Sequence, residues 1–289
     1  MGEKSAAGDG SFPYEDRNPA WIVVGEERDS PEGKVIHWTQ PEILLYDDDP
    51  FIRMSYPDLV DDNGGYFVTE TQKNIGRIHQ VPGPILDGLF GQFENCSAAE
   101  QGRVVNLPGD APTPPTVPMP ALPAFHARDN KQPDYRGKDL RAGFSLDFWV
   151  KLENLAPNQA ILDSRNENGG GILVATTESG TLRITLNDGR QECAWECDRD
   201  VLHAGQLQHV GIVVDGGPKI ITFIVDGVLC DGGDQRQFGW GRFSPTLRAP
   251  NGADTVKVSP AVQALRVYTR ALRTSEMVGN FHAGKTSAQ

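Results

Sequence analysis

The stretch FSLDFWVKL, residues 144–152, decides the fold of the larger part of the chain. Every second residue from Phe144 to Val150 is apolar, and Ser145, Asp147 and Trp149 take the positions between them. Because successive side chains of a β-strand point to opposite faces, such a strand has one strictly apolar face. That face needs a second layer to cover it, so the stretch predicts one strand of a packed sheet.

Six further segments of this kind follow, separated by turns rich in Gly, Asp and Asn. They are AILDSR (160–165), GGILVATTE (170–178), GTLRITLNDG (180–189), LQHVGIVVDG (207–216), KIITFIVDGVL (219–229) and VQALRVYTR (262–270). In the turns NDG and VDGV, glycine supplies the positive φ that a tight hairpin needs. The series predicts an all-β fold, built as a two-sheet antiparallel sandwich.

The end of the chain has helical spacing. In RTSEMVGNFHAG, residues 273–284, Met277 and Phe281 are four residues apart, as on one face of a helix. Thr274 is placed to cap the N-terminus of this helix, and Gly284 can end it.

A proline-rich segment separates this part from the preceding one. LPGDAPTPPTVPMPALPAF, residues 107–125, carries seven prolines in 19 residues. We expect residues 96–134 to form an extended linker or a wrapping strap. The chain therefore divides into residues 1–95, this linker or strap, and residues 135–289.

Short strands are also expected in residues 1–95. They are AWIVVG (20–25), KVIHW (34–38), PEILLY (41–46), YPDLV (56–60), GYFVTET (65–71) and IGRIHQV (75–81). The turn signals SPEG, DDDP and DDNGG separate some of them, as is typical of all-β proteins. Residues 83–93, GPILDGLFGQF, predict one short helix.

Composition and charge exclude several classes of function. With 38% hydrophobic residues, 32 Gly and 21 Pro, the chain fits a turn-rich soluble protein. The longest apolar runs, such as WIVV and IITFIV, are too short to span a membrane. The net charge of −12 disfavours nucleic acid as a partner, because no basic patch offsets it.

The N-terminal residues MGEKSAAGDGSFPYEDRNP contain no apolar segment of signal-peptide length. Two interpretations stay open: the protein remains inside the cell, or the chain begins after a removed or truncated segment.

Four cysteines, Cys96, Cys193, Cys197 and Cys230, allow three pairings in an oxidising compartment. In a straight strand Cys193 and Cys197 would lie ~13 Å apart, so these two could bond to each other only across a turn. A disulfide that involves Cys230 stays open. Cys-x3-Cys without a matching Cys or His pair is a poor signal for zinc.

The order of the strand segments in residues 135–289 resembles the laminin-G-like or concanavalin A-like jelly-roll superfamily. The resemblance covers roughly residues 139–284 and rests on GFSLDFWVKL, ILDSR, GTLRITLNDG, LQHVGIVVDGG, ITFIVDGVL and ALRVYTRALRTSEMVGNF. It implies a two-sheet jelly roll, and His209 resembles a structural histidine of that family. It says almost nothing about the ligand.

Residues 1–95 resemble the final blades of a sialidase-like β-propeller. RDSPEGKVIHWTQPEILLY, residues 28–46, resembles a degraded Asp-box hairpin that keeps Trp38, Thr39 and Pro41. SYPDLVDDNGGYFVTE, residues 55–70, resembles the segment whose first Tyr is the nucleophile of that family. The resemblance implies that Tyr56 is the corresponding residue.

A Tyr hydroxyl titrates near pH 10, so a nucleophilic Tyr56 needs a neighbouring carboxylate, for which Asp58 and Glu70 are the candidates. Arginines hold the substrate carboxylate in that family, and Arg28 or Arg53 could supply one of them. A blade needs four strands and ~40–50 residues, so residues 1–95 supply about two blades, and a propeller closes with at least four. The alternative is that these residues only pack a blade, cap a turn or pair along a strand.

Exposed aromatic rings bind sugars by stacking. Trp195 in CAWEC and Trp240 in FGWGRF lie in loop-like or edge contexts and are the candidates. We expect Trp149 to face the core or to lie between the sheets.

Jelly-roll sandwiches often hold Ca²⁺ through Asp and Asn oxygens at strand ends. Asp163, Asp188 and Asp226 are the candidate ligands, with Asn187 and Asp215 in similar positions. The alternative is that these Asp and Asn residues simply make turns.

The leading hypothesis is a carbohydrate-binding or structural module, attached to remnant sialidase-like blades, from an extracellular or periplasmic glycan-processing protein. A cytoplasmic location stays open. The expected partner is a glycan or polysaccharide, and a homo-oligomer or further blades could complete the propeller. The alternative is a sialidase-type glycoside hydrolase that uses Tyr56 and is active only when the propeller is completed. For this chain alone we lean against an enzyme.

Overall fold

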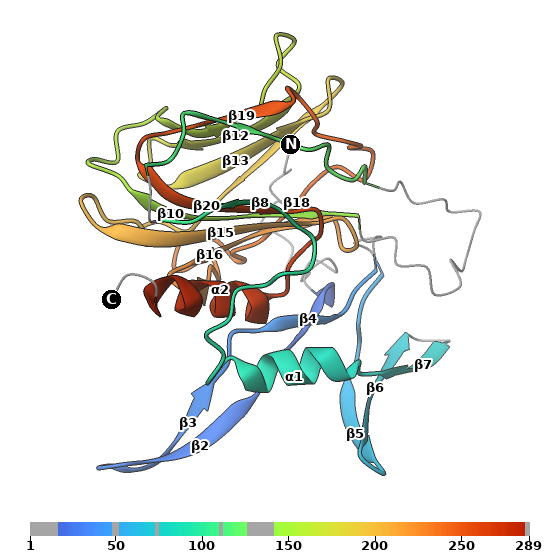
Figure 1. Ribbon diagram of the computed structural model, residues 1–289. Coiled ribbons are helices and arrows are strands. Elements are labelled where there is room, and N and C mark those ends of the chain that lie inside the picture. The colour runs from blue at the N-terminus through green and yellow to red at the C-terminus, as the bar shows by residue number, and fades with distance from the viewer. Residues whose placement is uncertain (1–16, 48–51, 73–74, 110–111, 126–141, 287–289) are drawn as a thin grey trace. The chain divides into compact units, whose positions relative to one another are not determined.

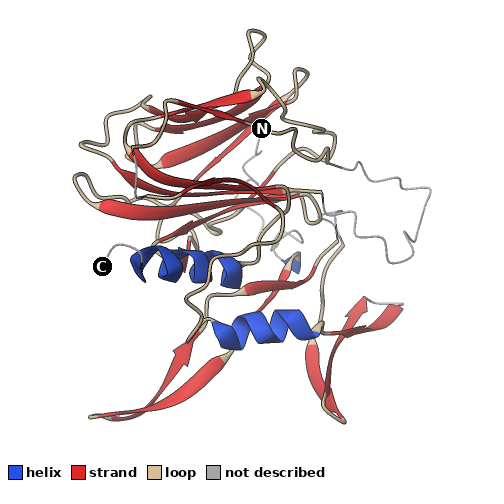
Figure 2. Ribbon diagram, in the orientation of Figure 1, coloured by secondary structure: helices blue, strands red, loops and turns tan. Residues whose placement is uncertain are grey.

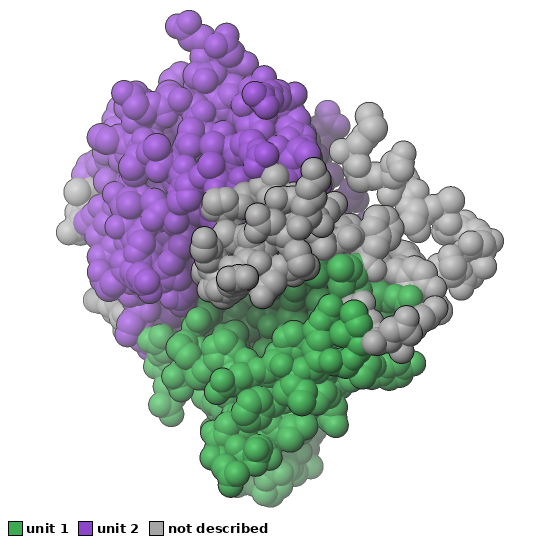
Figure 3. Space-filling model, turned by 90° about the vertical axis from the view of Figure 1, so that its right-hand side faces the viewer, with its two compact units in different colours: residues 1–95, 273–275 green, residues 96–272, 276–289 purple. Residues whose placement is uncertain are grey.

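The computed structural model describes residues 17–47, 52–72, 75–109, 112–125 and 142–286 (Figure 1). The chain divides into two compact units, coloured separately in Figure 3. Unit 1 comprises Met1–Asn95 and Arg273–Ser275, and unit 2 comprises Cys96–Leu272 and Glu276–Gln289. Among the described residues, no helix is both long enough and apolar enough to cross a membrane.

Unit 2 is a sandwich of two antiparallel sheets. The first sheet has the strand order β17 (Val228–Leu229), β16 (Ile220–Val225), β15 (Leu207–Asp215), β10 (Phe144–Lys151), β20 (Val262–Tyr268) and β8 (Arg103–Leu107), and β18 (Gly241–Arg242) also pairs with β16. The second sheet has the order β14 (Glu192–Glu196), β13 (Leu182–Asn187), β12 (Gly171–Thr176), β11 (Ala160–Asp163), β19 (Thr255–Val258) and β9 (Thr116–Pro118). The predicted two-sheet antiparallel sandwich is therefore confirmed.

Strand β10 lies in the middle of the first sheet and its apolar face points into the sandwich. Phe148 is opposite Val210 of β15 on one side and Leu265 of β20 on the other, and all three are fully buried. The second sheet contributes Val174 and Ile184 to the same core. Burying a side chain of this kind is worth ~1.5–3 kcal/mol, so this core supplies the main driving force for the sandwich.

Trp149 lies on the other face of β10, where helix α2 (Thr274–Thr286) runs along the first sheet (Figure 2). Its ring stacks on Phe281 of α2, with ring centroids 5.8 Å apart. The expectation that Trp149 faces the core or lies between the sheets is wrong, because β10 alternates strictly and Trp149 falls out of phase with Phe148.

The helix predicted at the end of the chain is α2, but Thr274 is its first residue rather than its cap. The carboxylate of Glu42, also in unit 1, accepts the N–H groups of Thr274 at 3.1 Å and of Ser275 at 2.7 Å. The carboxylate of Glu42 thus accepts hydrogen bonds from backbone N–H groups at the start of the helix, the role that the sequence predicted for the side chain of Thr274.

The proline-rich segment belongs to unit 2, and its described part contributes to both sheets. Strand β8 is an edge strand of the first sheet and β9 is an edge strand of the second. Met119, Leu122 and Phe125, which follow β9, are buried in the core. We call residues 116–125 the strap, because they connect the edge of the second sheet to the interior of the sandwich.

The described part of unit 1 contains three small sheets and one helix. The sheets are β1 (Ala20–Ile22) with β4 (Glu42–Leu45), β2 (Gly25–Ser30) with β3 (Gly33–Trp38), and β5 (Asp58–Asp62), β6 (Gly65–Gln72) and β7 (Ile75–Gln80), and the helix is α1 (Gly83–Gly91). Leu45, Met54, Val68 and Val81 form a small apolar cluster. No sheet in the described part of unit 1 has four strands, so the expected propeller blades are not confirmed.

Candidate functional site

Tyr56, the residue that corresponds to the sialidase nucleophile, lies just before β5 and is 81% exposed. Its backbone has a φ of 51°, in the left-handed region that an aromatic side chain rarely adopts. No described residue donates to or accepts a hydrogen bond from its hydroxyl. Asp58, on the exposed strand β5, is opposite Thr69 and makes no ion pair with a described residue.

Glu70 is the buried acid of this region, with 1% of its surface exposed. Its Oε1 accepts a hydrogen bond from Arg77 at 2.7 Å and lies 3.4 Å from Nε2 of His79. Its Oε2 is buried and has no hydrogen-bond partner among the described residues. Glu70 and Tyr66 are four residues apart on β6, so their side chains take the same face of the strand.

The two candidate arginines of unit 1 lie in different contexts. Arg28 forms an ion pair with Glu26 on its own strand and lies over the ring of Phe93 at 5.3 Å. Arg53 lies between β4 and β5 and is half-buried. No ion pair joins either arginine to Glu70 among the described residues.

Trp195 is built into the edge of the second sheet. Its Nε1 donates a hydrogen bond to the carbonyl of Gly239 at 2.9 Å. The guanidinium of Arg236 lies 4.6 Å from the ring centroid, and Gly241 lies so close that an added Cβ would clash with the ring. The half-buried ring packs against the core, and its role in stacking on a sugar stays a prediction.

Trp240 is half-buried in the segment that leads into β18. The ring of Phe238 stacks on it with centroids 4.7 Å apart, and the guanidinium of Arg242 lies 5.4 Å from its centroid. Protein groups therefore already contact this ring, and sugar binding there stays a prediction.

The carboxylates considered for calcium are engaged in local structure. Asp163 makes a two-pronged ion pair with Arg165, at 2.9 and 2.8 Å, and hydrogen bonds to Arg165 hold its pKa below the ordinary value. Asp188 accepts the backbone N–H groups of Arg190, Gln191 and Arg248.

Asp226 accepts hydrogen bonds from the side chain of Gln208 and the N–H of His209, and Asp215 accepts the N–H of Gly217. Asn187 accepts the N–H of Gly189. Within the described ranges, no three His, Cys, Asp or Glu side chains gather as a metal site would require. The contacts of these Asp and Asn side chains are therefore typical of turns rather than of a calcium site, and calcium binding stays a prediction.

The four cysteines are present as thiols. Cys96 is exposed, Cys193 is half-buried, and Cys197 and Cys230 are buried in the core of the sandwich. Burial raises the pKa of Cys193, Cys197 and Cys230 to about 12.

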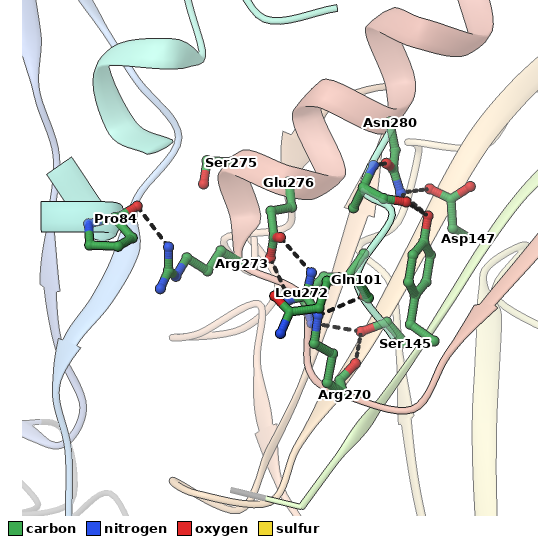
Figure 4. A network of polar contacts seen from close by, with 12 residues as sticks. Pro84, Gln101, Ser145, Asp147, Arg270, Leu272, Arg273, Ser275, Glu276 and Asn280 are labelled. Carbon is green, nitrogen blue, oxygen red and sulfur yellow. Dashed lines mark hydrogen bonds and ion pairs between the residues drawn. The ribbon is translucent and has the colours of Figure 1, made fainter. Parts of the chain in front are cut away.

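A buried polar network joins the first sheet to α2. Oδ2 of Asp147 lies 2.9 Å from Nε2 of His209 and accepts a hydrogen bond from Asn280 of α2 at 2.8 Å, and Oδ1 pairs with Arg266 at 3.1 Å. Figure 4 shows Asn280 pointing from α2 to Asp147. Burial opposes ionisation, but the neighbouring His209, Arg266 and Asn280 outweigh it and hold the pKa of Asp147 below its ordinary value.

This network was missed in the sequence, although an Asp inside an otherwise apolar strand was its signal. Asp147, His209 and Asn280 are each at most 1% exposed, so no substrate reaches them. The network is therefore structural.

The outer face of the second sheet is solvent-exposed, and apart from Leu173 its middle row carries polar and small side chains. Ala194, Thr185, Leu173, Asp163 and Lys257 lie opposite one another across five neighbouring strands and form an outer row. All five are exposed or half-buried, whereas their neighbours along the strands point into the core. Figure 2 shows α2 along the first sheet and no helix against the second in the described part of unit 2. A flat surface of this kind can accept a ligand rich in hydroxyl groups.

A pocket of about 190 Å³ lies at one end of the second sheet. Residues 119–122 of the strap form one side and residues 250–254 the other, and Ser164 and Ile172 also line it. The side chain of Asn251 joins the two sides through hydrogen bonds with the backbone N–H and carbonyl of Leu122. Ser164 directly follows Asp163 of the outer row, but its side chain is buried, whereas that of Asp163 lies half-buried on the outer face.

Comparison with known proteins identifies the family. Residues 131–277, just over half of the chain, match the concanavalin A-like lectin/glucanases superfamily. No curated protein matches the chain.

Similar solved structures include the CBM40 domain of a Ruminococcus gnavus IT-sialidase bound to α2,3-sialyllactose, with 15% identity, a TM-score of 0.35, and coverage of 56% of this chain and 96% of that one. A leech intramolecular trans-sialidase is 16% identical with a TM-score of 0.38, and 64% of this chain and 28% of that one are covered. Trypanosoma rangeli sialidase is 11% identical with a TM-score of 0.36, and 91% and 53% are covered. The chain thus spans about half or less of the two sialidases' length. On the match over residues 131–277, the chain belongs to the concanavalin A-like lectin/glucanases superfamily.

Proposed function

We propose that unit 2 is a carbohydrate-binding module and that glycans bind on the outer face of its second sheet. The observation that carries this proposal is the contrast between the two sheets. Helix α2 packs on the first sheet, through Phe281 on Trp149, whereas the outer row of the second sheet is exposed or half-buried. Membership of a lectin and glucanase superfamily supports the choice of ligand class.

The chemistry of the outer face suits a neutral, polyhydroxylated ligand. Thr185 offers a hydroxyl group, Asp163 carries a carboxylate that is already paired with Arg165, and Arg183 pairs with Glu196 at 3.2 Å near the sheet edge. Small side chains such as Ala194 and Ala175 leave room for a sugar ring to approach the sheet. Hydrogen bonds to a few such groups fix the orientation of a ligand, while the flat surface supplies contact area.

The test is a glycan array with the whole chain, followed by calorimetric titration of the best ligand. Thr185→Trp places a large ring in the middle of the outer row and should weaken binding by at least roughly tenfold. Val228→Trp, at an exposed position on β17 of the first sheet, is the matched control and should leave binding unchanged. Absence of binding to every glycan, with and without Ca²⁺, would refute the proposal.

A second candidate function is sialidase-type glycoside hydrolysis through Tyr56, with further propeller blades supplied by other chains or further sequence. The observation that favours it is the left-handed backbone of Tyr56, since strained residues of this kind concentrate at functional sites. Assay of a fluorogenic sialoside tests it, with Tyr56→Phe as the control. Equal rates for the two proteins, or no rate above buffer, would eliminate this candidate.

A further inference from the structure

The pocket at the end of the second sheet is too small for a whole oligosaccharide. Its volume of about 190 Å³ lies below the ~300–1,000 Å³ of pockets that enclose a complete small ligand. Asp163 of the outer row is the last residue of β11, and Ser164, which lines the pocket, follows it with its side chain buried, so the pocket lies at this end of β11. A ligand that extends from the outer face past the end of β11 could therefore place one substituent, and no more, in this pocket.

The inner wall of the pocket is apolar. Met119 and Leu122 of the strap and Ile172 of β12 line it, and all three are buried. Next to it lies a smaller void of about 10 Å³, which Met119, Ile172 and Ser164 also line together with core residues such as Leu146. Apart from Ser164 the residues that line this void are apolar, so it offers water too few hydrogen-bond partners to hold it well. The inner end of the pocket thus suits a methyl group.

Two polar groups of the pocket lining could form hydrogen bonds with a ligand. Ser164 is 3% exposed. Its hydroxyl accepts a hydrogen bond from the N–H of Ile172 at 3.1 Å and donates one to the carbonyl of Ile172 at the longer distance of 3.4 Å. Because that second contact is long, the hydroxyl proton can turn to a better acceptor. The carboxylate of Asp254 is exposed and makes no hydrogen bond or ion pair with the residues that the structure describes. The pocket thus offers one donor and one acceptor around an apolar interior.

We propose that this pocket receives the acetamido group of a neutral N-acetylhexosamine. The methyl group packs against Met119, Leu122 and Ile172, the acetamido carbonyl accepts a hydrogen bond from Ser164, and the amide N–H donates to Asp254. An acidic sugar is disfavoured, because its carboxylate would lie near Asp254 on a chain with a net charge of −12. The inference rests on the proposed carbohydrate binding and names the class of sugar.

Paired sugars and paired variants test the inference on the full chain. We would titrate the methyl glycosides of N-acetylglucosamine and N-acetylgalactosamine, the matching glucoside and galactoside, and sialyllactose. Acetylated sugars should bind at least roughly tenfold more tightly than their unacetylated counterparts, because only they fill the pocket. Ser164→Ala should reduce that preference, while Asn154→Ala, an exposed polar position away from the pocket, should not.

A pocket-filling variant separates the pocket from the rest of the surface. Ala121 is exposed and lines the pocket, so Ala121→Trp should abolish the preference for acetylated sugars without unfolding the protein. Ala124 is also exposed and lies on the same strap outside the pocket, so Ala124→Trp is the control and should behave as wild type. Circular dichroism melting curves of both variants verify that they are folded.

The outcomes distinguish this inference from the proposed function. Equal affinity for acetylated and unacetylated sugars, an unchanged preference in Ala121→Trp, or tighter binding of sialyllactose would overturn the acetamido pocket and leave carbohydrate binding standing. No binding of any sugar, in the titrations and on the array, would overturn both. Two results together would support both proposals: Thr185→Trp abolishes binding, and Ala121→Trp still binds sugars but no longer prefers the acetylated ones.

Discussion

His209 and Asp147 lie on the adjacent strands β15 and β10 with Nε2 and Oδ2 2.9 Å apart, and both side chains are at most 1% exposed. Because the pKa of Asp147 is held below its ordinary value, its carboxylate is ionised at neutral pH and the His209 N–H donates. The pair anchors Asn280 of α2 through a second hydrogen bond to the same oxygen. This relationship fixes α2 on the outer face of the first sheet.

Removal of the Asp147 carboxylate should strongly destabilise unit 2. Asp147→Ala would leave His209, Arg266 and Asn280 without their common acceptor in a buried site, which typically costs ~3–5 kcal/mol. Urea unfolding measures the loss. Asp163→Ala breaks an ion pair with the partly exposed Arg165 and should cost no more than ~1 kcal/mol, so equal losses in the two variants would contradict the structure.

The Asp147 network also predicts how stability depends on pH. A carboxylate whose pKa is lower in the folded than in the unfolded state stabilises the fold above the unfolded value and ceases to do so as the pH falls through the folded value. The contribution of Asp147 should therefore be complete at neutral pH and decline below about pH 4. Thermal melting of the wild type and Asp147→Asn between pH 7 and pH 2 measures it. A constant difference between the two proteins over that range would show that Asp147 is not the group concerned.

Replacement of Gly241 by a larger residue should destabilise the protein, because the ring of Trp195 lies against it. An added Cβ at Gly241 clashes with the indole ring, which Arg236 also contacts, so the ring cannot easily withdraw. Gly241→Ala should cost ~1–3 kcal/mol in the free energy of unfolding. Gly76→Ala is the matched control, since a Cβ there meets no atom within 4 Å. An unchanged free energy of unfolding in Gly241→Ala would show that the Trp195 ring does not lie against Gly241.

The four cysteines should differ in the rate at which their thiols react. In the native protein at pH 8, Ellman's reagent should react quickly with the exposed Cys96 and slowly with Cys193, Cys197 and Cys230, whose pKa burial raises to about 12. Four thiols should react in urea without reductant. A count of two in urea would instead reveal a disulfide, and Cys230→Ser would show whether Cys230 takes part in it.

Several features of the fold were predictable from local pattern. The alternation in residues 144–150 predicts β10 and its buried face, because side-chain direction in a strand depends only on position parity. Glycine-containing turns such as VDGV predict hairpins, and Asp226 and Gly227 of this turn indeed have positive φ. Element ends were less secure: Thr274 begins α2, but Glu42, far away in the sequence, accepts its N–H.

The candidate binding surface was less accessible to sequence reasoning. The sequence pointed to Trp195 and Trp240 because exposed aromatics bind sugars, yet both rings contact protein groups on the edge of the sandwich. The outer row carries no large aromatic residue and therefore left no signal in the chain. The strap residues Met119 and Leu122 appeared only as part of a proline-rich segment, although they line the pocket.

The sequence by itself determined that residues 135–289 form a two-layer β-sandwich, because each alternating strand has an apolar face that must be covered. It did not determine which outer face would stay open. That choice depends on where α2 packs, and hence on the contacts of Asp147, His209 and Asn280. Asp147 and Asn280 are 133 residues apart in the sequence and meet only in the folded protein. Tertiary structure likewise decided that the strap meets residues 250–254 to enclose a pocket, since Asn251 and Leu122 are 129 residues apart along the chain and no local pattern records their hydrogen bonds.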